Sequence, residues 1–149
     1  NAMSTVKRRT VPLGEEVDTV RTYLSLEAMR YEERLRVRFE IDPLLERSPV
    51  PPMVLQTLVE NAVRHGIATL LEGGDLRVIA SRTPEGIRLV VRNTGHYTPG
   101  QVKGSGIGLR NTRKRLEMLY NGKAQLQIFN DNGEVESRVD LPTRTQANS

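Results

Sequence analysis

Two pairs of alternating segments, each pair joined by a short turn, constrain this chain more than any other feature. Residues 75–81 and 87–92 flank the turn TPEG, and residues 124–129 and 134–141 flank the turn NDNG. An apolar residue at every second position is typical of a half-buried strand, and short turns rich in Gly, Asn and Asp join antiparallel neighbours. The sequence therefore predicts two β-hairpins.

Helical periodicity marks three other stretches, residues 13–34, 53–66 and 106–120, where apolar residues recur every three or four positions. One more strand is expected at 35–41, which alternates cleanly. The resulting order has no strict alternation of strands and helices. We therefore expect an α/β (α+β) two-layer sandwich, in which the helices cover one face of a mixed, mostly antiparallel sheet.

Composition limits the chemistry that is open to the chain. The 149 residues are enough for one domain with a real core, and no apolar run approaches the roughly 18 residues that span a bilayer. There is no cysteine, and His65 and His96 are the only histidines, which argues against disulfides, thiolate zinc sites and histidine-rich metal sites. The net charge of +4 is compatible with nucleic acid, an anionic membrane or a phosphate ligand, and does not choose among them.

We expect a single domain over residues 11–142. Residues 1–10 are interpreted as the remnant of a cleaved expression tag and a loose leader, and residues 143–149 as a flexible tail. Residues 42–52 contain four prolines and are expected to form a connector within the domain. No signal peptide is visible, so a cytoplasmic location is expected.

The stretch LVENAVRHG, residues 58–66, places polar chemistry beside the apolar side of the second helix. Its polar residues are Glu60, Asn61, Arg64 and His65. An asparagine oxygen is a hard ligand that suits a hydrated magnesium ion, and an arginine suits phosphate oxygens. A carboxylate in the same place could orient a water molecule or accept a proton. An ordinary solvated helix face explains the same residues, and the second helix alone favours that explanation.

Residues 104–109, GSGIGL, lead into the third helix, which is basic. Glycines let backbone N–H groups approach a ligand closely, and the first turn of a helix adds unpaired N–H donors and a partial positive charge. Together they make an anion site. The spacing fits neither the dinucleotide-binding fingerprint nor the Walker loop. A flexible turn that caps the helix is the alternative.

The segment VVRNTG, residues 90–95, ends a strand with a side-chain amide and a glycine. The amide of Asn93 both donates and accepts hydrogen bonds, so it could pair with the edge of a purine. A plain turn at the end of a strand is the alternative, because Asn and Gly are well suited to turns.

Taken in this order, the three segments resemble the N box and the two glycine boxes of the Bergerat-fold (GHKL) ATPases. Residues 11–142 are similar to the ATP-binding domain of LytS/YehU-type sensor histidine kinases. The strongest marks are the proline pair before LQTLVENA and the run GIGLRNTRKRLEMLY. Three ordered boxes are far more specific than any one of them.

The resemblance implies a site for ATP and Mg²⁺ with two catalytic residues. Asn61 would coordinate the magnesium ion that bridges the phosphates, and Glu60 would position water or polarise the acceptor. Arg64 would contact phosphate, with His65 beside it. Asn93 stands where many members carry an aspartate that binds the adenine amino group, and this departure weakens the expected contact. The other nucleotide-binding residues implied are Gly95, Gly104, Ser105, Gly106, Ile107, Gly108 and Leu109.

The resemblance also implies a function, transfer of the ATP γ-phosphoryl group to a histidine outside this chain. Neither His65 nor His96 is in the context of a phosphoacceptor, since His65 belongs to the N box and His96 to the expected ATP lid at 96–103. The implied partners are the phosphoacceptor and dimerisation region of the parent protein and a response regulator. A parent protein anchored in the inner membrane is left open.

Three alternatives stay open at this point. The first is another Bergerat-fold ATPase, or a relative that phosphorylates serine. The second is a nucleic-acid-binding module using the basic residues 110–115, although the chain lacks a set of aromatic residues for stacking on bases, so we expect no nucleic acid partner. The third is a degenerate scaffold domain with poor affinity for nucleotides.

Overall fold

The central sheet has five strands in the order β2-β4-β5-β7-β6. The computed structural model describes residues 10–32, 34–98 and 106–143. The strands of this sheet are β2 (Leu35–Ile41), β4 (Gly74–Arg82), β5 (Gly86–Thr94), β6 (Gln125–Asp131) and β7 (Glu134–Pro142). The helices are α2 (Leu13–Arg30), α3 (Val54–His65) and α4 (Gly106–Tyr120). Two short strands, β1 (Val11–Pro12) and β3 (Pro49–Val50), and two 3₁₀ turns, Pro43–Leu45 and Ile67–Thr69, complete the described elements.

The sheet is mixed, as the sequence predicts. Both expected hairpins form, with β4 antiparallel to β5 and β6 antiparallel to β7, and β5 also pairs antiparallel with β7. Strand β2 alone runs parallel to its neighbour, with Leu35 opposite Gly74. A parallel pair needs a long connection, and here that connection contains α3.

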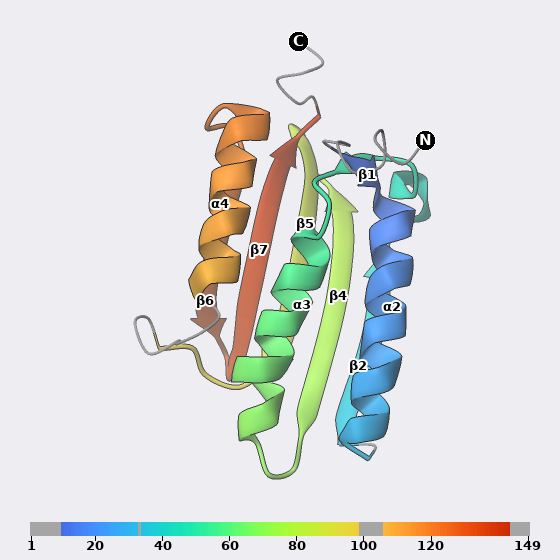
Figure 1. Ribbon diagram of the computed structural model, residues 1–149, viewed down its shortest axis with the longest axis vertical. Coiled ribbons are helices and arrows are strands. Elements are labelled where there is room, and N and C mark those ends of the chain that lie inside the picture. Colours follow the sequence, from blue (N-terminus) through green and yellow to red (C-terminus); the bar gives the residue numbers. More distant parts are fainter. Residues whose placement is uncertain (1–9, 33, 99–105, 144–149) are drawn as a thin grey trace.

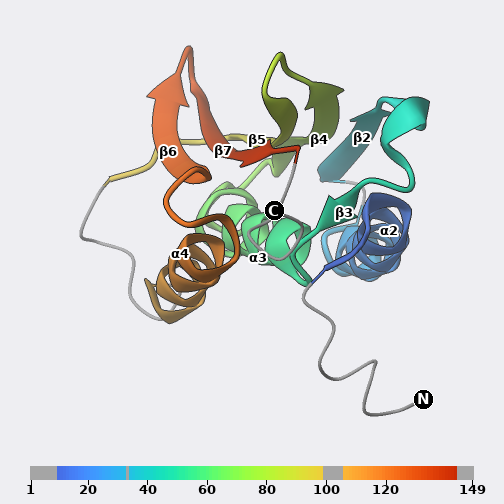
Figure 2. The ribbon, with the colours of Figure 1, turned by 90° about the horizontal axis from the view of Figure 1, so that it is seen from above.

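All three described helices lie on the same face of the sheet, with α3 between α2 and α4 (Figures 1 and 2). Their apolar sides meet the inward-facing side chains of the strands in one core. Fully buried members of this core include Leu24, Leu55, Leu58, Leu76 and Leu89. The expectation of a two-layer sandwich with helices on one face is confirmed.

Two boundaries differ from the sequence-based expectation. Helix α2 ends at Arg30 rather than at residue 34, because Glu32 takes a left-handed backbone conformation with φ of +50° and the chain turns toward β2. The proline-rich connector is more ordered than expected, since Val50 within it pairs with Val11 in a small antiparallel sheet.

The two ends of the expected domain stay predictions. Residues 1–9 and 144–149, which include the expected tag remnant and most of the expected tail, lie outside the described residues. Within the described part of the chain, none of the helices has the length and apolar character needed to cross a membrane.

Candidate functional site

One side of α3 carries a polar stripe that faces the start of α4, with its middle residue buried and its two ends half-buried. Thr57, Asn61 and His65 are four residues apart and therefore share a face. A Cβ atom placed on Gly108, in the first turn of α4, would lie 3.6 Å from Cγ2 of Thr57. The stripe therefore points toward the helix that the glycine box leads into.

Two polar atoms of this stripe are buried without a partner. Asn61 is 9% exposed, and neither its Oδ1 nor Nε2 of His65 has a hydrogen-bond partner among the described residues. Buried polar groups in folded proteins are nearly always paired. Two such atoms on one stripe indicate a site for a group that the described chain does not itself supply.

Burial sets the charge of the histidine. It lowers the pKa of His65, and the positive charge of Arg64 lowers this pKa further. The imidazole is therefore neutral at pH 7, with one nitrogen that donates and one that accepts a hydrogen bond. A neutral ring beside an amide oxygen suits a polar or anionic ligand without adding charge to the site.

The other polar residues of α3 face α2. Gln56 donates a hydrogen bond from Nε2 to Oε2 of Glu60 at 3.0 Å. Burial raises the pKa of Tyr23 in α2 to about 12, the charges of Glu27 and Glu60 add to the rise, and Arg64 opposes it. Glu60 and Arg64 therefore lie close to Tyr23, on the side of α3 that is turned toward α2.

The single polar face expected from the sequence is thus divided in two. Asn61 and His65 lie on the stripe toward α4, whereas Glu60 and Arg64 lie toward α2. The reason is that α3 packs between two helices (Figure 2), so a polar arc that spans more than 100° meets a different neighbour on each side. Asn61 is also buried, so the alternative of an ordinary solvated face does not hold for this residue.

The end of β5 lies against the end of α3. Asn93 is 2% exposed and donates from Nδ2 to the carbonyl oxygen of Thr94 at 2.9 Å. A Cβ atom on Gly66, the residue after α3, would lie 2.1 Å from Nδ2 of Asn93, so only glycine fits there. Gly95 has φ of +140°, a conformation that favours glycine, and its N–H donates to the carbonyl oxygen of Gly133 at 3.1 Å. The segments LVENAVRHG and VVRNTG are therefore neighbours in space.

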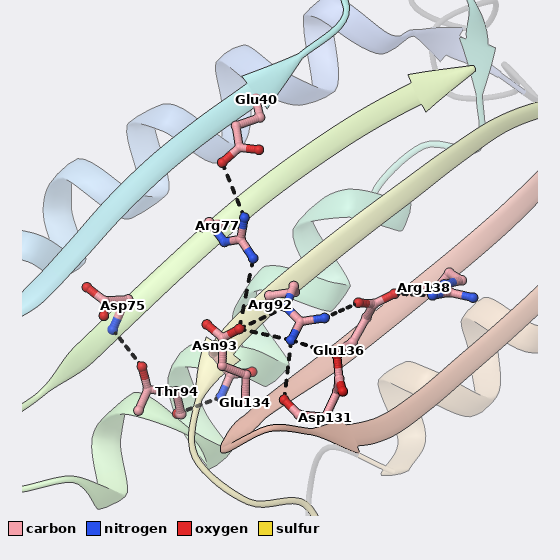
Figure 3. A network of polar contacts seen from close by, with 10 residues as sticks. All are labelled: Glu40, Asp75, Arg77, Arg92, Asn93, Thr94, Asp131, Glu134, Glu136 and Arg138. Atoms are coloured by element: carbon pink, nitrogen blue, oxygen red, sulfur yellow. Dashed lines mark hydrogen bonds and ion pairs between the residues drawn. The ribbon is translucent and has the colours of Figure 1, made fainter. Parts of the chain in front are cut away.

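A network of ion pairs on the opposite face of the sheet holds this strand end in place (Figure 3). Arg92 pairs with Glu134 at 2.9 Å and with Asp131 at 3.1 Å, and it also contacts Glu136. Thr94 Oγ1 accepts a hydrogen bond from the backbone N–H of Asp75 at 3.0 Å. Both sequence neighbours of Asn93 are thus fixed by contacts to adjacent strands.

The glycine box is described only from its third residue. Gly104 and Ser105 lie outside the described residues, while Gly106 and Ile107 begin α4 as expected. Thr112 donates from Oγ1 to the carbonyl oxygen of Gly108 at 3.0 Å, and Leu109 packs against the core. The first turn of α4 is therefore in place beside the polar stripe of α3.

Most of the expected lid lies outside the described residues, which end at 98 before the gap. His96 is exposed. Tyr97 exchanges two hydrogen bonds with the side chain of Asn130: its N–H donates to Oδ1 at 2.7 Å, and its carbonyl accepts from Nδ2 at 2.8 Å. The start of the segment is therefore tied to the hairpin of β6 and β7.

Magnesium is compatible with the residues that the structure describes. Among them there is no group of three or more His, Cys, Asp or Glu side chains that could hold a metal ion by itself. Magnesium commonly keeps several waters and uses one or two protein oxygens together with substrate phosphates. The unpaired Oδ1 of Asn61 is an oxygen of this kind.

Sequence reasoning missed three features that shape this region: Gly66, the Arg92 network, and Glu16 in α2. Glu16 has a signal in the sequence, since its position lies on the apolar side of α2 between Leu13 and Val20. The sequence signal for Arg92 is weaker and consists of the acidic residues at alternate positions 134 and 136 of the last strand. Gly66 is the last residue of the helical stretch expected at 53–66, and nothing in that pattern signals its contact with Asn93.

Comparison with known sequences finds sensor proteins named LytS. The sensor protein LytS of Staphylococcus saprophyticus is 31% identical over 148 residues, which covers 91% of this chain and 25% of the relative. The sensor histidine kinase/phosphatase LytS of Staphylococcus aureus is 31% identical over 153 residues, covering 94% of the chain and 26% of the relative. The chain thus spans about a quarter of the length of these relatives. No protein-family model matches it.

Solved structures agree on the fold. The catalytic domain of histidine kinase ThkA, in a nucleotide-free form, has a TM-score of 0.68 at 18% identity, covering 92% of this chain and 97% of that domain. The chain has the fold of a histidine kinase catalytic domain, and its sequence relatives are LytS sensor kinases. Full-length ShkA in complex with AMPPNP has a TM-score of 0.65 at 18% identity, covering 93% and 32% of the two chains. ThkA in complex with the response regulator protein TrrA gives 0.64 at 16% identity, covering 95% and 45%.

Proposed function

We propose that this catalytic domain binds Mg²⁺ and ATP between α3 and the start of α4. The observation that carries the proposal is the buried Oδ1 of Asn61, on the stripe that faces the first turn of α4, for which the described residues supply no hydrogen-bond partner. Helix N-termini bind anions, so the phosphates belong at α4. The LytS relative named as a histidine kinase and the complex of ShkA with AMPPNP support this ligand.

The residues have distinct proposed roles. Asn61 holds magnesium, which offsets phosphate charge when it is bound, and neutral His65 donates or accepts a hydrogen bond beside it. Asn93 reads the adenine edge next to Gly95. The N–H groups of Gly104, Ser105, Gly106, Ile107, Gly108 and Leu109 wrap the phosphates.

Glu60 and Arg64 belong to a second group, because they face α2 rather than α4. We propose that they act at the rim of the site. Arg64 contributes positive potential toward the phosphates, and Glu60 orients the incoming acceptor. Positioning and electrostatic stabilisation supply most of the catalysis in phosphoryl transfer. A large contribution from Glu60 to chemistry would therefore require the acceptor to approach from the α2 side.

The proposed reaction is transfer of the γ-phosphoryl group to a histidine outside this chain, in a longer sensor kinase. A response regulator is the proposed downstream partner, and the complex of ThkA with TrrA supports this. Because ATP is available in the cytoplasm, the proposal places this domain there, whatever anchors the longer protein.

The residue type that accepts the phosphoryl group distinguishes a histidine kinase from a serine kinase. Labelled ATP is incubated with the domain and the upstream part of the parent protein, and the labelled protein is then treated with acid and with alkali. We expect label that acid removes and alkali leaves, as for phosphohistidine. Label that survives acid and is lost in alkali would indicate phosphoserine and overturn this part of the proposal.

A further inference from the structure

Helix α3 is capped by a carboxylate from another helix. Glu16 of α2 accepts hydrogen bonds from the backbone N–H of Met53 at 2.9 Å and from that of Leu55 at 3.2 Å. These N–H groups lie at the start of α3, where helices have unsatisfied donors. Met53, which precedes α3, has φ of +68° and supplies no side-chain cap. The cap that most helices take from their own sequence therefore comes from α2.

The segment that enters α3 is held by both of its neighbours, α2 and α4. At its α2 side, the N–H of Leu13 donates to the carbonyl oxygen of Ser48 at 2.8 Å. At its α4 side, Arg115 donates from Nη1 to the carbonyl oxygen of Pro52 at 2.6 Å. Glu16 adds the contact to the first turn itself. The start of α3 is thus the point where α2, α3 and α4 are fixed relative to one another.

Burying a carboxylate to form this cap costs free energy. Glu16 is 6% exposed, and burial raises its pKa, although the N–H groups of Met53, Leu55 and Gln56 oppose the rise by stabilising the charged form. A charged group buried at such a cost adds little to stability. Residues that add little to stability but break a local rule are found chiefly at functional sites, where activity requires a fixed geometry.

We propose that Glu16 is a positioning residue for the nucleotide site. It fixes the start of α3 against α2, and through α3 it sets the place of Asn61 opposite the first turn of α4. Asn61 follows Leu55 by six residues, or about 9 Å along a helix, so a tilt at the capped end displaces the polar stripe. The inference rests on the proposed function, since it concerns the geometry of that same site.

Three variants test the inference in the whole chain. Glu16→Gln keeps the size and one accepting oxygen, Glu16→Ala removes the cap, and Asp18→Asn removes an exposed carboxylate from the same helix as a matched control. The affinity for a non-hydrolysable ATP analogue with Mg²⁺ is measured by calorimetry at a temperature where urea unfolding shows that each variant is folded. We expect a loss of affinity of roughly threefold for Glu16→Gln and roughly tenfold for Glu16→Ala, the range by which residues outside a site change binding at it, and no change for Asp18→Asn.

NMR distinguishes the proposed positioning role of Glu16 from a role in stability alone. Displacement of the stripe changes the side-chain amide signals of Asn61 in folded Glu16→Gln, whereas a purely structural role leaves them at their wild-type positions. Unchanged affinity and unchanged Asn61 signals in folded Glu16→Gln overturn the inference, and this holds even if Glu16→Ala does not fold. If the wild-type domain itself does not bind the analogue, the proposed function fails and the inference fails with it.

Discussion

Asn93 and Gly66 pack so closely that a Cβ atom on Gly66 would lie 2.1 Å from Nδ2 of Asn93. This contact joins the end of β5 to the end of α3, and so brings together two of the three segments that the sequence marks as functional. The distance leaves no space for any side chain at position 66, because the same Cβ would also lie 2.7 Å from the carbonyl oxygen of Ala62.

The contact predicts opposite effects for two glycine substitutions. Gly66→Ala is expected to lower the free energy of unfolding by about 1–3 kcal/mol, because a methyl group is forced into a packed site. Gly108→Ala is the matched control, since its Cβ meets only Thr57 at an ordinary 3.6 Å, and alanine in a helix is favoured by about 1 kcal/mol. Urea unfolding of both variants checks this. Equal stability of wild type and Gly66→Ala would contradict the close contact.

The ion-pair network on the open face predicts a stability loss for Arg92→Ala. Arg92 pairs with Glu134 and Glu136, and the side chain of Glu136 is only 7% exposed. Truncation leaves the buried carboxylate of Glu136 without one of its partners, so we expect a loss of about 2 kcal/mol in the free energy of unfolding. Arg36→Ala is the control, because Arg36 and Asp75 are both 58% exposed and such pairs contribute at most about 1 kcal/mol. Similar losses for the two variants would show that the network is not stabilising.

The buried carboxylate predicts a particular pH dependence. The pKa of Glu16 is raised from its usual 4.5, with burial as the main cause. The folded protein therefore binds more protons than the unfolded chain between 4.5 and the raised value, and stability is lost as the pH rises through that range. The free energy of unfolding of wild type minus that of Glu16→Gln should thus be largest below pH 4.5 and fall as the pH rises. A difference that grows with pH would mean that hydrogen bonds to the charged form outweigh burial.

Asn93→Asp is predicted to lower the stability of the fold and to strengthen recognition of adenine. The Nδ2 donor to Thr94 is replaced by an acceptor, and a carboxylate is placed where Asn93 is 2% exposed. We expect a loss of about 1–3 kcal/mol in the free energy of unfolding without nucleotide. Under the proposed function, the affinity for an ATP analogue relative to the GTP analogue should rise, because a carboxylate accepts from the adenine amino group. An unchanged ratio would show that position 93 does not contact the base.

Local periodicity predicted most of the fold. The strand at 35–41 and the helix at 106–120 have the expected bounds, because alternation and helical spacing extend to their ends. The end of α2 was not predictable, since nothing in the local pattern signals the left-handed conformation of Glu32. The local pattern could not show that Val11 of β1 pairs with Val50 of β3, because the two residues are some forty positions apart.

The sequence named candidate site residues but could not predict how they are arranged. The resemblance assigned Asn61 and Asn93 to one nucleotide site, which stays a prediction, and the segments that carry them meet at Gly66. Helical spacing could not show that Glu60 faces α2, because this depends on where the helices pack around α3. The role of Glu16 depends on a contact to Met53 across 37 positions, and only the tertiary structure reveals it.

The most direct test is a calorimetric titration of the domain with a non-hydrolysable ATP analogue, with and without Mg²⁺, repeated with Asn61→Ala. Gln127→Ala, which truncates an exposed amide on β6, is the control. The proposed function predicts magnesium-dependent binding to wild type and to Gln127→Ala, and its loss in Asn61→Ala while the variant stays folded. Binding that is the same without Mg²⁺, or that survives in Asn61→Ala, would contradict the assignment of Asn61 and of this site.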